Sequence, residues 1–217
     1  MKNYVTEFIG TFFLVLTIGL CVTGDVGSLA KDGNFAPIAI GSALMVMVYM
    51  GGHVSGAHYN PAVSLAVLIR GKMPAGDLLP YWIAQILGAV VGCILASLAT
   101  GKSFAVMPGE GVSTLSAVLV EVVFTFALAL VVLNVATAKA TAGNSYYGLA
   151  IGFTIVVAAF SGGGISGGAF NPAVATGAAI NSMVHGQGAG PIWLYWIGPL
   201  LGGVLAGAAY KVQNPGD

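Results

Sequence analysis

The sequence contains very little charge. Only 6% of its 217 residues are Asp, Glu, Lys or Arg, whereas an average soluble domain carries about a quarter. So few charges cannot cover the surface of a water-soluble fold of this length. They suffice in a bilayer, where charge is confined to the rims and to functional positions. The scarcity of charge therefore excludes a soluble domain.

The few charges also balance, because seven are basic and seven are acidic. The chain thus lacks the basic surface that nucleic acid binding requires. Cysteine is scarce as well: Cys21 and Cys93 fall in apolar stretches, without the CxxC or Cys/His spacing of a metal site or a disulfide framework. We therefore expect no nucleic acid partner, no metal and no cofactor.

What the sequence has in abundance is long apolar runs. Six runs approach the length of about 20 residues that crosses hydrocarbon, and two shorter ones would reach about 15 Å, half of the hydrocarbon core. A half-span is tolerated where its broken backbone faces protein or a water-filled cavity, so the pattern predicts a cavity at membrane depth. The predicted spans are 5–24, 36–54, 78–99, 113–136, 146–163 and 192–211, and the half-spans are 61–70 and 172–181.

Basic residues predict the orientation of these spans. If both termini are cytoplasmic, the inner loops and ends hold five Lys or Arg residues and the outer loops hold two, as the positive-inside rule favours. We therefore expect a multi-pass protein of the plasma or inner cell membrane. The inner residues are Lys2, Arg70, Lys72, Lys139 and Lys211, and the outer ones are Lys31 and Lys102.

The chain also contains an internal repeat. Residues 55–63 (SGAHYNPAV) correspond to residues 166–174 (SGGAFNPAV), and Glu7 and Glu121 precede the two copies at nearly equal distances. Each half has three spans, an odd number, so the second copy is expected to be inverted and the half-spans to enter from opposite faces. We expect one domain, 1–217, with repeats at about 4–100 and 112–211.

Each copy contains Asn-Pro-Ala, which favours the start of a helix. Asn is a preferred N-cap, and Pro at the first helical position lacks only an N–H that would have no partner. While the Asn oxygen caps, its NH₂ is expected to donate into the cavity. Two facing helix N-termini also place about half a positive charge each at the midplane, which opposes cations. The motif residues are Asn60, Pro61, Ala62, Asn171, Pro172 and Ala173.

The glycine-rich segment before each Asn cannot be helical throughout, so its carbonyl groups are expected to line the approach to the midplane. These carbonyl groups belong to Gly56, Ala57, His58, Gly167, Gly168 and Ala169. Two such motifs within six spans resemble the aquaporin family, also called the major intrinsic proteins, over essentially the whole chain. The resemblance implies an all-α membrane fold of six transmembrane helices and two re-entrant half-helices, passive flow of water, and a homotetramer in the lipid bilayer.

The resemblance also assigns roles to other residues. In the family, the counterparts of Glu7 and Glu121 accept backbone hydrogen bonds from the re-entrant loops; a proton-relay pair is the alternative. Most members carry Arg three positions after the second Asn, where this chain has Val174. The remaining filter positions correspond to Ile40, Ala159 and Gly168.

All four filter residues are apolar or small, so the filter looks wider and less polar than a strict water filter. Plant tonoplast-type members also carry Val at the Arg position, which implies passage of water and of small neutral solutes such as urea and ammonia. A glycerol or small-polyol facilitator is the main alternative. Against it, Val174 is followed by Ala175 rather than by the Asp typical of glycerol channels, and Tyr195-Trp196 resembles the water-type members.

Two further alternatives belong to other classes. Inverted repeats with broken helices also build secondary transporters, but these need chargeable groups in the lumen. Residues 164–168 match the GxSxG pattern of a serine hydrolase, yet the next helix starts only at Pro172, and Ser55 occupies the equivalent place in the first repeat. We therefore expect a channel and no enzyme. The histidines that could act as a base, or as a pH gate, are His53, His58 and His185.

Overall fold

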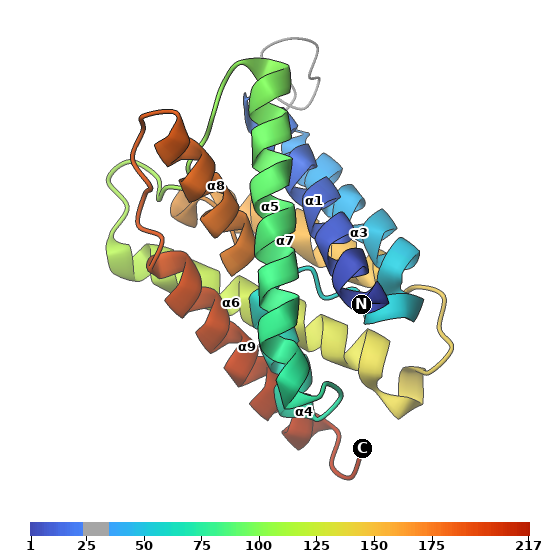
Figure 1. The fold of residues 1–217 in the computed structure, drawn as a ribbon. Coiled ribbons are helices and arrows are strands. Elements are labelled where there is room, and N and C mark those ends of the chain that lie inside the picture. Colours follow the sequence, from blue (N-terminus) through green and yellow to red (C-terminus); the bar gives the residue numbers. More distant parts are fainter. Residues whose placement is uncertain (24–34) are drawn as a thin grey trace.

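The computed structural model describes residues 1–23 and 35–217, and this part of the chain folds into α-helices joined by loops (Figure 1). Short helical turns, η1 (Ala75–Asp77) and η3 (Lys139–Thr141), lie in the loops, and a π-helical turn, η2 (Leu133–Thr137), continues one of the long helices. The α-helices are α1 Lys2–Thr23, α3 Ala36–Ser55, α4 Pro61–Arg70, α5 Leu78–Thr100, α6 Thr114–Val132, α7 Tyr147–Ser166, α8 Pro172–Val184 and α9 Leu194–Gln213.

Each predicted apolar run overlaps one of these helices, although the ends of most differ by a few residues. Five helical stretches in the described residues are long and apolar enough to cross a membrane: Lys2–Thr23, Ala36–Ser55, Ala75–Thr100, Thr114–Thr137 and Tyr147–Ser166. The sixth predicted span, α9, has 20 residues but is less apolar, because it includes Pro199, Lys211 and several glycines. The lengths of α4 and α8, 10 and 13 residues, make both of them half-spans.

The second half-helix extends further than the sequence indicated. We expected it to end near residue 181, where the apolar run gives way to Asn181 and Ser182, but α8 continues to Val184. Both polar residues are buried. Asn181 Nδ2 donates to Ser97 Oγ at 2.7 Å, which offsets part of the cost of burying the amide group, while its Oδ1 has no partner among the described residues. A hydrogen bond across to α5 therefore allows the helix to continue.

Glycine allows the helices to approach each other closely. A Cβ atom on Gly88 of α5 would lie 2.4 Å from the Phe8 carbonyl oxygen of α1. Gly41 of α3 and Gly152 of α7 face each other, and a Cβ on either would lie within 2.6 Å of the other's carbonyl oxygen. These glycines therefore serve contacts within one chain, as expected for small residues between membrane helices.

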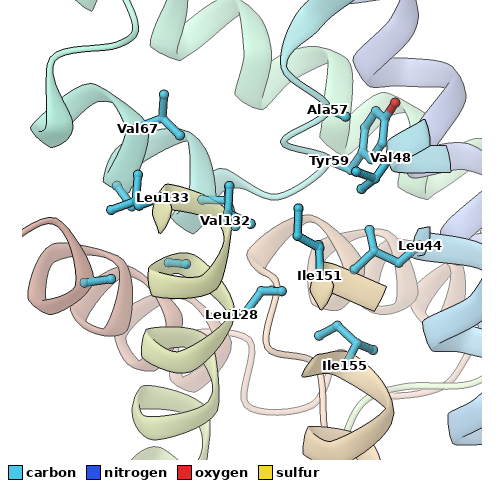
Figure 2. Close-up of a cluster of buried hydrophobic side chains, with 14 of the residues drawn as sticks. Leu44, Val48, Ala57, Tyr59, Val67, Leu128, Val132, Leu133, Ile151 and Ile155 are labelled. Atoms are coloured by element: carbon cyan, nitrogen blue, oxygen red, sulfur yellow. The ribbon is translucent and has the colours of Figure 1, made fainter. Parts of the chain in front are cut away.

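The half-helices lie inside the bundle, where α4 packs against α9 and α8 packs against α5 (Figure 1). Figure 2 shows the apolar centre beside them, with Leu44 of α3, Leu128 of α6 and Ile155 of α7 directed toward one another. The outer faces of the long helices are also apolar, and Leu98 of α5 is 78% exposed. Such faces suit contact with lipid. Lys31, which we placed in an outer loop, lies outside the described residues.

Candidate functional site

The N-termini of α4 and α8 meet inside the bundle, and each is capped as the sequence predicts. Asn60 has an extended backbone, and its Oδ1 accepts from the Ala62 N–H at 2.9 Å. Asn171 does the same with the Ala173 N–H, also at 2.9 Å. Proline follows both caps, so the first free N–H of each half-helix is the one that its Asn satisfies.

The asparagine NH₂ groups are not wholly free, contrary to the expectation from the sequence. Asn60 Nδ2 donates to the Phe170 carbonyl at 2.8 Å, and Asn171 Nδ2 donates to the Tyr59 carbonyl at 2.9 Å. Each Asn thus donates to the carbonyl group of the residue that precedes the other Asn, and these two bonds connect the two loops. An amide NH₂ carries two hydrogens, so each Asn retains one N–H for another acceptor.

The loops that lead to the two asparagines have a strained backbone. Ala57, Tyr59 and Phe170 have φ values of 51°, 50° and 48°, a left-handed conformation that costs roughly 1 to 2 kcal/mol for a residue other than glycine. Gly168, with φ 69°, takes the place of Ala57 in the second loop. Such conformations persist only when the surroundings hold them.

The two glutamates hold these loops. Glu7 is fully buried and accepts from the N–H groups of His58 (2.9 Å) and Tyr59 (2.6 Å). Glu121 is equally buried and accepts from the N–H groups of Ala169 (3.0 Å) and Phe170 (2.6 Å). Backbone donors that would have no partner at membrane depth are thereby satisfied.

Serine and tyrosine side chains complete the same arrangement in both loops. Ser55 and Ser166 donate to Glu7 and Glu121, each at 2.7 Å. Their carbonyl groups accept from the hydroxyl groups of Tyr81 and Tyr195, at 2.8 and 2.6 Å. These tyrosines were not predicted as loop supports, although the Tyr-Trp pair recurs at 81–82 and 195–196 and could have revealed them.

A cavity of about 410 Å³ opens onto the two capped helix ends. Asn60 and Asn171 lie in its wall, and so do all four predicted filter residues: Ile40, Ala159, Gly168 and Val174. Most of the remaining wall is aliphatic, and no Asp, Glu, Lys or Arg of residues 1–23 and 35–217 contributes to it. The cavity therefore combines a mostly apolar wall with a few polar groups.

The loop carbonyl groups proposed from the sequence also lie beside open space. Ala57, His58, Gly167, Gly168 and Ala169 line the 410 Å³ cavity, and Gly56 lines a second cavity of about 420 Å³ on the other side of the first loop. None of these six carbonyl oxygens accepts a hydrogen bond from the residues that the structure describes. They are therefore available to a permeating molecule.

Of the three histidines, one lies at the site. His58 is buried and lines both cavities. His53 at the end of α3 lines a separate cavity of about 500 Å³, and His185 follows α8, where its Nδ1 lies 2.8 Å from the Asn181 carbonyl oxygen. The three histidines therefore do not form a cluster.

The hydrolase alternative is wrong. Ser166 is the last residue of a helix rather than the end of a strand, so the nucleophile elbow is absent. Its hydroxyl donates to the buried Glu121 at 2.7 Å and bonds no histidine. A hydroxyl that donates to a carboxylate and supports a loop is not an activated nucleophile.

A polar cluster at the end of α4 was also missed. Arg70, which ends the predicted half-span 61–70 and was counted with the inner loops and ends, is the buried last residue of α4 and pairs with Asp217 at 3.1 Å. The Tyr210 hydroxyl donates to Asp217 at 2.6 Å, and the Lys139 N–H donates at 3.1 Å. These hydrogen bonds and the two neighbouring cations lower the pKa of Asp217 to about 2.

Comparison with known proteins supports this description. Residues 1–210 match the family model described as "Major intrinsic protein". The chain is 38% identical to the probable aquaporin TIP2-1 of Oryza sativa subsp. japonica, over 97% of this chain and 86% of the relative. It is 35% identical to aquaporin Z of Bradyrhizobium diazoefficiens, over 97% and 92%.

The fold is shared with a solved structure, the aquaglyceroporin from Plasmodium falciparum. The TM-score is 0.87, at 24% identity, over 99% of this chain and 97% of the other. This likeness confirms the predicted all-helical membrane fold. Together with the family match, it shows that the protein is a membrane channel rather than an enzyme. The chain belongs to the major intrinsic protein family, the aquaporins.

Proposed function

We propose that this channel passively conducts water and small neutral solutes, such as urea and ammonia, through a wide apolar filter. The observation that carries the proposal is the 410 Å³ cavity, whose wall contains Asn60, Asn171 and Val174 but no charged side chain from the described residues. The remaining N–H of each Asn and the free loop carbonyl groups can replace the hydrogen bonds that a solute loses on leaving water.

The width of the filter is assigned to Ile40, Ala159, Gly168 and Val174. Val174 is buried in a cluster with Val15, Ala89 and Cys93, and Phe104 packs against this cluster. The filter thus offers no fork of N–H donors to a permeant, and it selects by size and by neutrality. The facing N-termini of α4 and α8 oppose cations, because the positive ends of both helix dipoles point to the place where the two helices meet.

The glutamates support a channel better than a secondary transporter. Glu7 and Glu121 are fully buried, accept hydrogen bonds from the loops, and line neither of the two cavities beside the asparagines. A coupled transporter needs chargeable groups that meet the permeating solute or its coupling ion. We assign both carboxylates to holding the loops.

The proposal also includes the domain organisation, the oligomeric state and the membrane location of the channel. The chain forms one channel domain, 1–217, whose inverted repeats occupy about 4–100 and 112–211. Four copies assemble into a homotetramer with one pore in each, in the plasma or inner cell membrane and with both termini cytoplasmic. The apolar outer faces of the helices, such as the exposed Leu98 of α5, suit contacts with lipid and with neighbouring copies.

The test is a stopped-flow panel on purified protein in liposomes, with water, urea, ammonia and glycerol as permeants and a proton-leak control. We expect the vesicles to shrink faster than empty ones after an osmotic step, and to take up urea and ammonia faster. Equal rates for water would refute the channel proposal. Fast glycerol uptake would favour a polyol facilitator, and saturable uptake driven by a gradient would favour a transporter.

A pair of variants links the flux to this cavity. Ala159→Trp places a large ring in the filter, and we expect it to abolish all fluxes. Val157→Trp adds the same ring two residues away on α7, where the side chain is 56% exposed on the outer face, and it is expected to conduct normally. Equal flux through both variants would show that the pathway lies elsewhere.

A further inference from the structure

The inner end of the pathway contains one side chain that could bind a permeant directly. The His58 ring lies between the 410 Å³ cavity and the 420 Å³ cavity and lines both. Its Nδ1 is 3.1 Å from Ser64 Oγ, and its Nε2 lies beside Gly56, which lines the second cavity. Nε2 has no hydrogen-bond partner among the described residues. What this nitrogen offers to a solute depends on which ring nitrogen carries the proton.

Ser64 determines where that proton is. Its Oγ has three neighbours: His58 Nδ1 at 3.1 Å, the Asn60 carbonyl at 3.2 Å, and Gln85 Nε2 at 3.0 Å. The carbonyl can only accept and the amide NH₂ can only donate. A hydroxyl has one proton, so all three contacts are hydrogen bonds only if Ser64 donates to Asn60. His58 Nδ1 must then be the donor.

The orientation of the Gln85 amide, on which this count depends, is set by Glu7. Gln85 Nε2 lies 2.8 Å from Glu7 Oε2, and a carboxylate oxygen requires a donor. The amide therefore directs its NH₂ toward both Glu7 and Ser64. Its Oε1 is buried without a partner among the described residues, a cost that the charge-assisted bond to Glu7 offsets.

We propose that Ser64 is a positioning residue that holds His58 as the Nδ1–H tautomer, so that an unprotonated Nε2 faces the inner end of the pathway as a hydrogen-bond acceptor. This inference rests on the proposed function, because the acceptor serves solutes that carry O–H or N–H groups, which are water, ammonia and urea. His58 is thus a hydrogen-bond acceptor for permeants on the side of the asparagines opposite the filter.

The second loop shows that the His58–Ser64 pair is not needed to hold a loop in place. The equivalents of His58 and Ser64 are Ala169 and Ala175, yet Ala169 keeps the same backbone bond to Glu121, at 3.0 Å. The loop can therefore be held without an imidazole and a hydroxyl. Their presence in the first loop alone provides one acceptor side chain, on one side of the midplane.

The tautomer can be read directly by nitrogen NMR on ¹⁵N-histidine-labelled protein in bilayers. The chain has three histidines, and His53→Gln and His185→Gln assign the remaining signals to His58. At about pH 8, above the ordinary histidine pKa of about 6.5, we expect Nδ1 to appear protonated and Nε2 unprotonated. A protonated Nε2 of His58 would overturn the proposal, and the two assigning variants leave His58 and Ser64 themselves unchanged.

Variants then test the role of Ser64. Ser64→Ala removes the acceptor for Nδ1, so we expect an Nε2–H population to appear, with water and ammonia permeability falling about two- to fivefold, the loss of one modest hydrogen bond. Ser64→Thr keeps the hydroxyl and is expected to restore the spectrum and the flux. Ala175→Ser, the matched change in the other loop, is expected to leave His58 unchanged.

The NMR spectrum and the flux test two different claims, and either claim can be refuted without the other. If the unsubstituted protein shows no flux but has the expected tautomer, the proposed function is wrong and the geometry of His58 is not. If it conducts and Ser64→Ala changes neither the tautomer nor the flux, Ser64 does not position His58. A tautomer change without any change in flux would refute the role of His58 as an acceptor for permeants.

Discussion

The loop before α4 and the loop before α8 share one set of hydrogen bonds but differ in the side chains around them. Each has an Asn cap with a 2.9 Å bond, a serine that donates to its glutamate at 2.7 Å, and two backbone N–H groups on the same carboxylate. Trp82 and Trp196, which follow the supporting tyrosines, contact each other edge to face, with ring centres 5.5 Å apart.

Three differences make the surroundings of the first loop more polar. Glu7 accepts a fourth hydrogen bond, from Gln85, whereas the position that corresponds to Gln85 is Pro199 in α9. His58 and Ser64 correspond to alanines in the second loop. The shared bonds therefore position the asparagines, and the residues that vary between the loops determine what each side of the midplane offers to a solute.

The largest effect is expected from removing either carboxylate. Glu7→Ala leaves four donors without their acceptor, and Glu121→Ala leaves three, at roughly 1 to 3 kcal/mol for each buried donor. We expect both variants to lose water flux and Glu7→Ala to unfold at the lower temperature. Thermal unfolding in detergent and stopped-flow measurements check this. The reverse order of stability would show that Gln85 adds nothing to the first loop.

The second-largest effect is expected from a substitution in the filter. Val174→Arg adds a large cation to the apolar wall, so we expect urea and ammonia permeability to fall about tenfold, or roughly 1.4 kcal/mol, and water permeability to fall less. Val174→Leu narrows the filter without adding charge and serves as the control for width. Solute uptake is measured as in the flux panel. If the Arg variant leaves the ratio of urea to water flux unchanged, Val174 does not discriminate between them.

A smaller effect tests whether the supporting tyrosines contribute equally to the two loops. Tyr81→Phe and Tyr195→Phe each remove one hydroxyl that donates to a loop carbonyl, at 2.8 and 2.6 Å. One neutral hydrogen bond contributes about 1 kcal/mol, so we expect both variants to lower the unfolding temperature by similar amounts and to keep the preference for water over urea. A selective change in solute flux in one variant would show that its tyrosine also acts on the permeant.

Much of the fold could be predicted because its signals are local. Apolar length gave the spans, and the starts of α4 and α8 follow from the chemistry of Asn and Pro in adjacent positions. The caps were predicted for the same reason. The bonds from Asn60 and Asn171 to the opposite loop were not, because their acceptors lie 110 and 112 residues away along the chain.

The residues missed by sequence analysis are those whose role depends on another helix. Gln85 is a single polar residue within the apolar α5, and only the position of Glu7 on α1 gives it a partner. Ser64 matters because His58 and Gln85 meet it in space. Arg70 gave no sign of burial, since its partners come from α9 and from residue 217.

The smallest effect concerns the far ends of the half-helices. α4 ends at Arg70, which is paired with Asp217, whereas α8 ends beside the exposed His185. The folded state lowers the pKa of Asp217 to about 2, below its ordinary value of about 3.9. The carboxylate form therefore favours folding: its contribution is complete above pH 4 and is lost as the pH falls through about 2.

Asp217→Asn tests this contribution. We expect the variant to unfold at a slightly lower temperature than the unsubstituted protein at pH 7, and the difference between the two to shrink as the pH is lowered from 4 to 2. His185→Asn provides the matched change beside α8 and is expected to leave the acid dependence between pH 4 and 2 intact. Thermal unfolding of the three proteins between pH 2 and 7 measures this. A difference that is constant with pH would mean that Asp217 stabilises the end of α4 through its hydrogen bonds alone, without a contribution from its charge.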